Sequence, residues 1–207
     1  MQYIYLHGFA SGPQSTKAQA LRSHFQTRDI TLHIPDLNQG DFAHLTLTRQ
    51  IQQVVPLVTP DTVLIGSSLG GVVATWVAET TAVSRLILLA PAFNFLNQWL
   101  PRLGTRALQH WQQSGQLSVY HYAEQRQLPL AQTFLTDARQ YDDTTLRRPL
   151  PTLILHGEQD DVVSLAGSQQ YAASRPWVRL TVLSTDHSMT DVIDVIWQEV
   201  QAFCDLG

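Results

Sequence analysis

One stretch of the sequence decides the fold: Val63-Leu64-Ile65-Gly66-Ser67-Ser68-Leu69-Gly70-Gly71. A short apolar run breaks into glycines and serines and then continues with helical spacing, which is typical of a strand, a tight turn and a helix. Within it, Gly66-x-Ser68-x-Gly70 matches a nucleophile elbow, in which a serine sits on a strained strand-to-helix turn. We therefore expect Ser68 to stand exposed above the strand end. Ser67 is the competing serine, but it falls on the strand side of the turn.

The helix that follows this turn matters for its electrostatics. Its first N–H groups have no partner within the helix, and the positive end of its dipole points at the turn. A negative charge that develops beside Ser68 would be stabilised there, with the backbone N–H of Leu69 as the nearest donor.

Composition limits the classes of function. The chain has 207 residues, 44% of them hydrophobic, and a net charge of −4, so we expect one domain over residues 1–207. The negative charge gives no electrostatic reason to expect a nucleic acid or an anionic membrane as partner, which favours a small-molecule substrate. The lone Cys204 excludes an internal disulfide.

The sequence shows no pattern typical of a targeting signal or a membrane span. Residues 1–7 lack the charged region and the long apolar run of a signal peptide, and no later stretch has the apolar length of a bilayer span. We expect a cytoplasmic protein; its oligomeric state is left open.

Short β-rich segments recur along the chain and alternate with helical spacing. They predict an α/β fold with an open, mostly parallel sheet of about six strands, helices on both faces, and active groups beyond the carboxyl ends of the strands. The expected strands are 3–6, 30–34, 62–65, 86–90, 152–156 and 178–183.

The alternation lapses between the fourth and fifth of these strands. Residues 93–100 and 103–111 have helical spacing, and residues 117–122 alternate as a strand does. A segment of this length should carry structure of its own or act as a lid. We interpret residues 93–148 as a lid-like insertion over the carboxyl edge of the sheet.

A serine nucleophile needs a base to take its proton, and a third group that orients the base. Strand 152–156 leads into Asp160, with Asp161 as the rival acid and Glu158 as a weaker one. Strand 178–183 leads into His187. The order serine, acid, histidine is that of α/β-hydrolases, so Ser68, Asp160 and His187 form the predicted triad.

The other histidines show no ligand spacing such as H-x-x-x-H, so no metal site is predicted. They are interpreted as structural or surface residues: His24, His33, His44, His110, His121 and His156. No phosphate-binding loop and no dinucleotide fingerprint occurs, so no cofactor is expected.

The turn after the first strand is His7-Gly8-Phe9. In this architecture a second oxyanion donor comes from such a loop. The backbone N–H groups of Phe9 and Leu69 are therefore the predicted oxyanion hole, with Ala10 as the alternative to Phe9.

Together these motifs resemble a known family. Tyr5-Leu6-His7-Gly8-Phe9, Gly66-Ser67-Ser68-Leu69-Gly70-Gly71, His156-Gly157-Glu158-Gln159-Asp160 and Asp186-His187 are similar to those of small α/β-hydrolases, and most of all to the compact YqiA-type esterases. The resemblance implies a cytoplasmic enzyme acting on short acyl esters. It also implies Ser68, Asp160 and His187 as the triad, position by position. The similarity fades over residues 93–148.

The predicted activity is that of a serine hydrolase cleaving carboxylic esters of short to medium acyl chains through an acyl-enzyme. A thioesterase or a peptidase with the same triad, and a non-catalytic binding protein of this fold, remain alternatives. The candidate substrate pocket is aromatic and comes from the insertion: Phe93, Phe95, Trp99, Trp111 and Phe134. Each of these side chains could equally form the insertion's own core.

Overall fold

A single parallel sheet dominates the fold. The computed structural model describes residues 1–206 and places six strands in the order β2-β1-β3-β4-β7-β8. All neighbouring pairs in this sheet are parallel. The strands are β1 (Gln2–Leu6), β2 (Leu32–His33), β3 (Thr62–Ser67), β4 (Arg85–Leu89), β7 (Thr152–Gly157) and β8 (Val178–Leu183).

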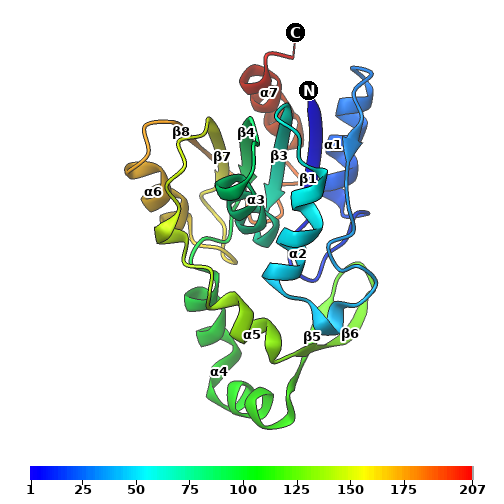
Figure 1. Ribbon diagram of the computed structural model, residues 1–207, viewed down its shortest axis with the longest axis vertical. Coiled ribbons are helices and arrows are strands. Elements are labelled where there is room, and N and C mark those ends of the chain that lie inside the picture. The colour runs from blue at the N-terminus through cyan, green and yellow to red at the C-terminus, as the bar shows by residue number, and fades with distance from the viewer. Residues whose placement is uncertain (207) are drawn as a thin grey trace.

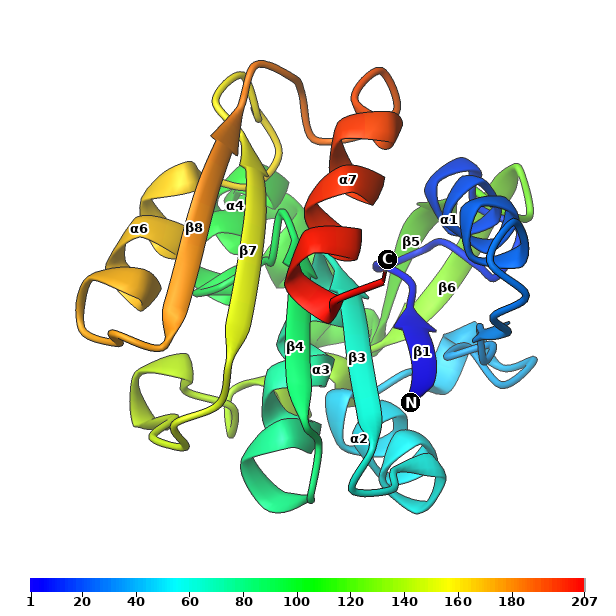
Figure 2. The same ribbon diagram turned by 90° about the horizontal axis from the view of Figure 1, so that it is seen from above.

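Helices cover both faces of the sheet (Figures 1 and 2). One apolar cluster joins the sheet to α1 (Thr16–Gln26) and α7 (Ile193–Cys204). The other joins the opposite face to α2 (Leu47–Val54) and α3 (Leu69–Thr80), and α6 (Leu165–Ala173) packs beside β7 and β8. The chain also contains three short 3₁₀ turns: η1 (Phe42–His44), η2 (Val55–Leu57) and η3 (Asp143–Thr145).

Position in the sheet explains the composition of the strands. Every residue of β3 and of β7 is buried, because helices lie over both faces of these central strands. The edge strand β8 has no buried residue, which accounts for its weaker apolar character. The predicted six strands and the α/β class are confirmed, and the main sheet is parallel throughout.

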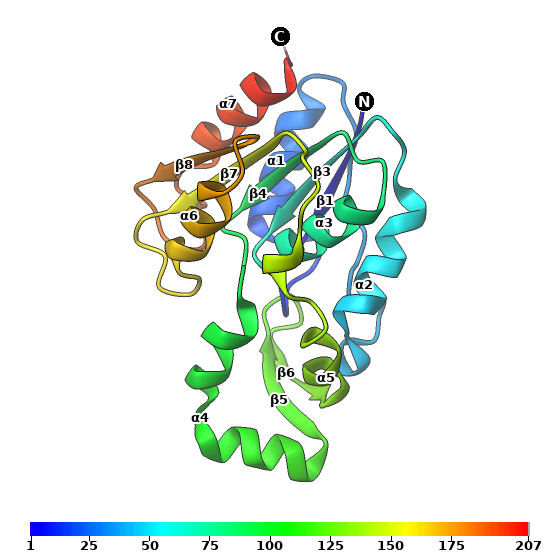
Figure 3. The same ribbon diagram turned by 60° about the vertical axis from the view of Figure 1, so that its left-hand side comes forward.

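Residues 93–148 form a separate layer beyond the carboxyl ends of the strands (Figures 1 and 3). The layer contains α4 (Phe95–Ser114), an antiparallel pair β5 (Gln116–His121) and β6 (Arg126–Ala131), and α5 (Thr133–Ala138). Gly104, at φ 76° and ψ 158°, breaks α4 into two pieces close to the predicted helical segments. The strand at 117–122 was also predicted, whereas β6 and α5 were not.

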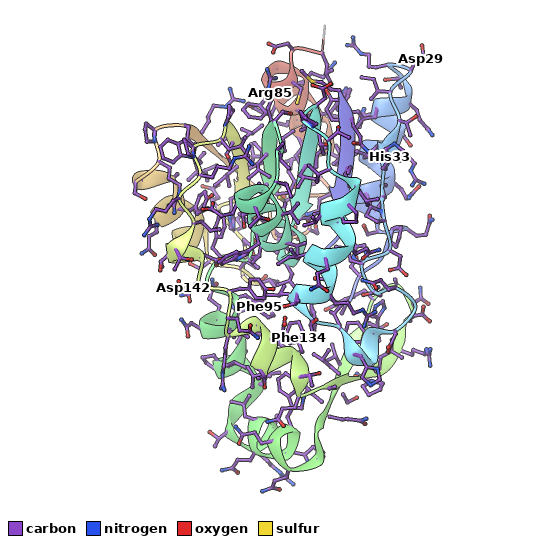
Figure 4. All side chains as sticks on the ribbon, viewed as in Figure 1. Asp29, His33, Arg85, Phe95, Phe134 and Asp142 are labelled. Carbon is purple, nitrogen blue, oxygen red and sulfur yellow. The ribbon has the colours of Figure 1, made fainter. Side chains whose placement is uncertain are left out.

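An aromatic cluster, defined here as Phe9, Phe95, Trp99 and Phe134, joins this layer to the rest of the molecule. The ring of Phe9 lies 5.3 to 6.1 Å from the other three ring centres. Figure 4 shows Phe95 and Phe134 where the layer meets the sheet. Aromatic pairs at such separations stabilise a contact beyond the area they bury. The loop after β1 is therefore anchored to residues 93–148.

Candidate active site

Ser68 lies on the strained turn between β3 and α3. Its backbone has φ 53° and ψ −121°, a conformation that costs a non-glycine residue of order 1–3 kcal/mol. Three backbone hydrogen bonds hold the turn: the Ser68 N–H donates to Leu89 O, and the Ser68 carbonyl accepts from the N–H groups of Gly71 and Ala92. The side chain is half-buried and faces a cavity.

The glycines of the elbow are required by close backbone contacts. A Cβ on Gly66 would lie 2.6 Å from the Cα of Gly71, and one on Gly70 would lie 2.5 Å from the carbonyl oxygen of His7. Cβ atoms do not approach other atoms so closely, so both positions need glycine. The loop after β1 thereby packs directly under the start of α3.

His187 and Asp160 come together from the loops after β8 and β7. The His187 Nδ1 lies 2.7 Å from the Asp160 Oδ2. Since a carboxylate can only accept, Nδ1 carries the proton and Nε2 is left with its lone pair. The His187 side chain is 23% exposed and lines the same cavity as Ser68, whereas the Asp160 side chain is fully buried. No hydrogen bond joins Ser68 to His187 within residues 1–206.

Asp160 accepts hydrogen bonds on both oxygens. Oδ1 accepts from the backbone N–H groups of Val162 and Val163 at 2.9 and 2.7 Å. Oδ2 accepts from His187 and also lies 3.2 Å from the Nε2 of His156. Burial pushes the pKa of Asp160 upward, but the hydrogen bonds from His156, His187 and Val163 outweigh it and hold the pKa well below its usual range. The carboxylate is charged at neutral pH.

His156, which the sequence pattern did not single out, contacts the predicted acid of the triad. Its ring is fully buried, with Nε2 also 3.1 Å from the carbonyl of Val163, so that Nε2 must carry a proton. Its Nδ1 lies 2.8 Å from the Oγ of Ser168 on α6. The ring thus ties Asp160 to the sheet. The signal available in the sequence was a histidine within an apolar strand, four residues before the acid.

The predicted oxyanion donors come from two segments beside Ser68, the loop after β1 and the start of α3. A Cβ on Gly8 would be 3.3 Å from the Cβ of Ser68, so the loop after β1 passes directly beside the serine. Within residues 1–206, the backbone N–H groups of Phe9 and Leu69 donate to no protein acceptor. Ala10, the alternative donor, has φ 52°, and its carbonyl accepts from the N–H of Tyr122.

His7 fixes this loop. Its buried Nε2 accepts from the N–H of Leu37 at 3.0 Å, so the proton is on Nδ1, which lies 3.0 Å from the carbonyl oxygen of Gly8. Donation from Nδ1 turns the Gly8 carbonyl toward the ring. The amide group that links Gly8 to Phe9 is therefore held in one orientation.

The cavity that contains Ser68 and His187 has a volume of about 550 Å³. Its lining includes the apolar side chains of Phe9, Phe95, Trp99 and Val119. The predicted pocket residues therefore divide: Phe95 and Trp99 lie on the cavity wall, whereas Phe93, Trp111 and Phe134 do not.

These three differ from the prediction for physical reasons. Trp111 is fully buried and donates from its Nε1 to the carbonyl of Leu130. Phe134 is fully buried inside the aromatic cluster. Phe93 stacks on Tyr171, with ring centres 4.3 Å apart, beside a second cavity of about 900 Å³ that contains neither Ser68 nor His187.

The rival residues differ in their burial. Ser67 is buried at the end of β3, although it also lines the cavity, and Asp161 and Glu158 are exposed. The described residues contain no group of three or more His, Cys, Asp or Glu that could hold a metal ion.

Among residues 1–206, no helix has both the length and the hydropathy that a bilayer span requires.

The fold is that of the α/β-hydrolases, as comparison with solved structures shows. Alpha/beta hydrolase domain-containing protein 10 from mouse is 21% identical, with 99% of this chain and 89% of that chain covered and a TM-score of 0.82. A putative hydrolase from Agrobacterium vitis S4 is 22% identical, with coverage of 98% and 87% and a TM-score of 0.85. Est1E from Butyrivibrio proteoclasticus, with ferulic acid bound, is 18% identical, with coverage of 98% and 87% and a TM-score of 0.80.

The family assignment follows from the sequence itself. Residues 2–204 match the family described as "Uncharacterised protein family (UPF0227)", and the chain belongs to that family. No curated protein sequence matches the chain significantly.

Proposed function

We propose that this protein is a serine hydrolase that cleaves carboxylic esters of short to medium acyl chains. The observation that carries the proposal is the geometry of one cavity. Ser68 stands there on a strained turn at the start of α3, and His187, tied to Asp160 at 2.7 Å, lines the same cavity. A nucleophile, a base and a group that orients the base are the parts that acyl transfer requires.

In the proposed reaction, the Ser68 Oγ attacks the ester carbonyl while the His187 Nε2 takes its proton. His187 then gives that proton to the alcohol as the carbon–oxygen bond breaks, which leaves an acyl group on Ser68. Water, deprotonated by His187, attacks the acyl-enzyme and releases the acid. Asp160 keeps the proton of His187 on Nδ1 and stabilises the imidazolium.

The oxyanion of each tetrahedral intermediate would be held by the N–H groups of Phe9 and Leu69. Support comes from their lack of protein acceptors and from the close approach of Gly8 to Ser68. One such donor is typically worth about 2.7–4 kcal/mol in the transition state. The start of α3 adds the positive end of a helix dipole.

The wall of the cavity supports an ester as substrate. Phe9, Phe95, Trp99 and Val119 offer an apolar surface to an acyl chain or an aryl group. Among proteins of similar structure, Est1E with ferulic acid bound and the lipolytic enzymes LipS and LipT suggest the same class of chemistry. Residues 93–148 supply Phe95 and Trp99, and we propose this layer as the lid of the cavity.

The test is active-site labelling. A fluorophosphonate probe reacts with a serine whose base and oxyanion hole are assembled, so intact mass and peptide mapping should show one adduct on Ser68. Ser68→Ala should abolish both labelling and the hydrolysis of para-nitrophenyl butyrate. Ser67→Ala is the matched control and should retain both.

An adduct at another residue, or hydrolysis that persists in Ser68→Ala, would refute the proposal. Parallel assays with a butyryl thioester and a butyryl anilide define the acyl bond. Faster turnover of the thioester or the anilide than of the ester would replace the esterase assignment.

A further inference from the structure

The candidate active site contains the chain's single lysine. Lys17 lies in the first turn of α1, and its half-buried side chain lines the cavity that holds Ser68 and His187. Its Nζ donates to the backbone carbonyl oxygen of His187 at 3.3 Å. The ammonium group therefore lies beside the loop that carries the proposed base.

This ammonium has no carboxylate partner. Lys17 forms no ion pair in the described part of the chain, and no Asp or Glu is among the described residues that line the cavity. Two acids act on Lys17 electrostatically without pairing with it, and both accept other hydrogen bonds: Asp160 accepts from four donors, and the Asp186 Oδ1 accepts from the N–H and Oγ of Ser188 and from the N–H of Met189.

A second cationic side chain, that of Arg102, also lines this cavity. Arg102 belongs to α4, and its Nη1 donates to the carbonyl of Val162 at 2.8 Å, which holds the guanidinium at the wall. A protein with a net charge of −4 thus presents two cations, and no carboxylate among the described lining residues, on the wall of this cavity. Burial lowers the pKa of Lys17 to about 8, so the ammonium form still prevails at neutral pH.

The placement of Lys17 indicates which part of a substrate it meets. Most of the apolar lining side chains come from the loop after β1, from α4 and from β5, whereas hydroxyl-bearing residues close in sequence to Lys17 or to His187 also line the cavity: Ser15, Thr16, Ser188 and Thr190. His187, whose carbonyl accepts from Lys17, would deliver the proton to the leaving alcohol. A charged group near Lys17 therefore belongs to the alcohol, and the acyl group belongs to the aromatic wall.

We propose that the substrate is an ester whose alcohol carries a carboxylate, which binds the Lys17 ammonium with Arg102 as a second cation of the site. The proposal rests on the hydrolase function proposed above. A carboxylate bound there gains a charge-assisted hydrogen bond in a cavity that is partly shielded from water. The reaction itself is unchanged: water supplies the hydroxyl of the released acid and the proton of the released alcohol.

The experiment compares two esters that differ in one charge. The kcat/KM of para-butyryloxybenzoate is divided by that of para-butyryloxybenzamide, so differences in overall activity cancel. The ratio should fall roughly 10- to 100-fold in Lys17→Met, as expected for the loss of a hydrogen bond to a charged group. Lys17→Arg should recover part of it. Arg22→Met, on the same helix but away from the cavity, is the control and should keep the wild-type ratio.

Three results would overturn the inference. A ratio that does not change in Lys17→Met would mean that Lys17 only supports the His187 loop, because a structural role lowers both activities together. A preference for a carboxylate on the acyl side, measured with the mono-para-nitrophenyl ester of glutaric acid against para-nitrophenyl butyrate, would reverse the assigned orientation. In the wild-type protein, inhibition by para-hydroxybenzoate that is no stronger than by para-hydroxybenzamide would also refute it, whether or not the variants fold.

These outcomes differ from failure of the hydrolase proposal. In that case neither ester would be hydrolysed and Ser68 would take no fluorophosphonate adduct. If both esters are hydrolysed without a preference for the charged one, only the proposed role of Lys17 is refuted, and the hydrolase proposal stands.

Discussion

Asp160→Asn is the most informative perturbation of the proposed site. The carboxylate accepts from two backbone N–H groups on Oδ1 and from His187 and His156 on Oδ2. An asparagine can accept on one atom only, and its amide nitrogen donates. If its oxygen stays with the backbone N–H groups, the new NH₂ faces the ring of His187 at the former 2.7 Å contact.

This contact forces a change of tautomer in His187. Two donors cannot share one hydrogen bond, so the proton would leave Nδ1 and move to Nε2, where it prevents acceptance of the Ser68 proton. In a serine triad this change lowers kcat roughly 10⁴-fold, or about 5.5 kcal/mol. We expect a loss of roughly 10³- to 10⁴-fold for Asp160→Asn on para-nitrophenyl butyrate.

Asp161→Asn is the matched control, because Asp161 is exposed and adjacent in sequence. It should keep kcat within about twofold, as surface substitutions leave sites intact. Circular dichroism of each variant verifies that it is folded. A large loss in Asp161→Asn together with normal kcat in folded Asp160→Asn would refute the assignment of the acid.

Three further predictions follow from named contacts. His156→Phe removes a hydrogen bond to the carboxylate of Asp160, so kcat on para-nitrophenyl butyrate should fall about tenfold; an unchanged kcat would exclude a positioning role. Arg148→Met removes the guanidinium that binds the carbonyl groups of residues 78, 81 and 83 at the end of α3, which should lower the free energy of unfolding in urea by about 2 kcal/mol and leave kcat intact. The preference for the anionic ester should decline between pH 7 and pH 9, because the pKa of Lys17 is about 8 and its positive charge is lost above that value. Near Lys17, the carboxylates of Asp160 and Asp186 stay charged over this range, and reductive ¹³C-methylation of this single lysine allows NMR to follow its titration directly.

The local sequence predicts those parts of the fold that depend on neighbouring residues alone, such as the elbow around Ser68. The elbow needs a buried strand, glycines at the close contacts and a helix, and all three are contiguous around Ser68. Strand 178–183 was predicted with the observed bounds, because its β-branched and apolar residues alternate between Pro176 before it and Ser184 after it. The pairing of Asp160 with His187 agrees with the expected order of the loops, and the roles of these residues remain predictions.

The missed features depend on contacts that are distant in sequence. Strand β6 contains Pro129, which cannot donate to a ladder, so the sequence disfavoured a strand that its pairing with β5 creates. Which aromatic side chains reach the cavity depends on how α4 bends at Gly104 and on what α5 covers. The sequence alone did not show that His156 contacts Asp160. Its ring is oriented by Ser168, which lies on a later helix, α6.

The order of the parts along the chain has a consequence for synthesis. Ser68 and the Phe9 amide belong to the first half of the chain, whereas Asp160 and His187 come from the loops after the last two strands. A nascent chain therefore carries its serine through most of translation without the base that would activate it. Any product truncated before residue 187 lacks that base entirely. Under the proposed function, the reactive nucleophile exists only in the finished molecule, so incomplete chains are harmless to the acyl esters around them.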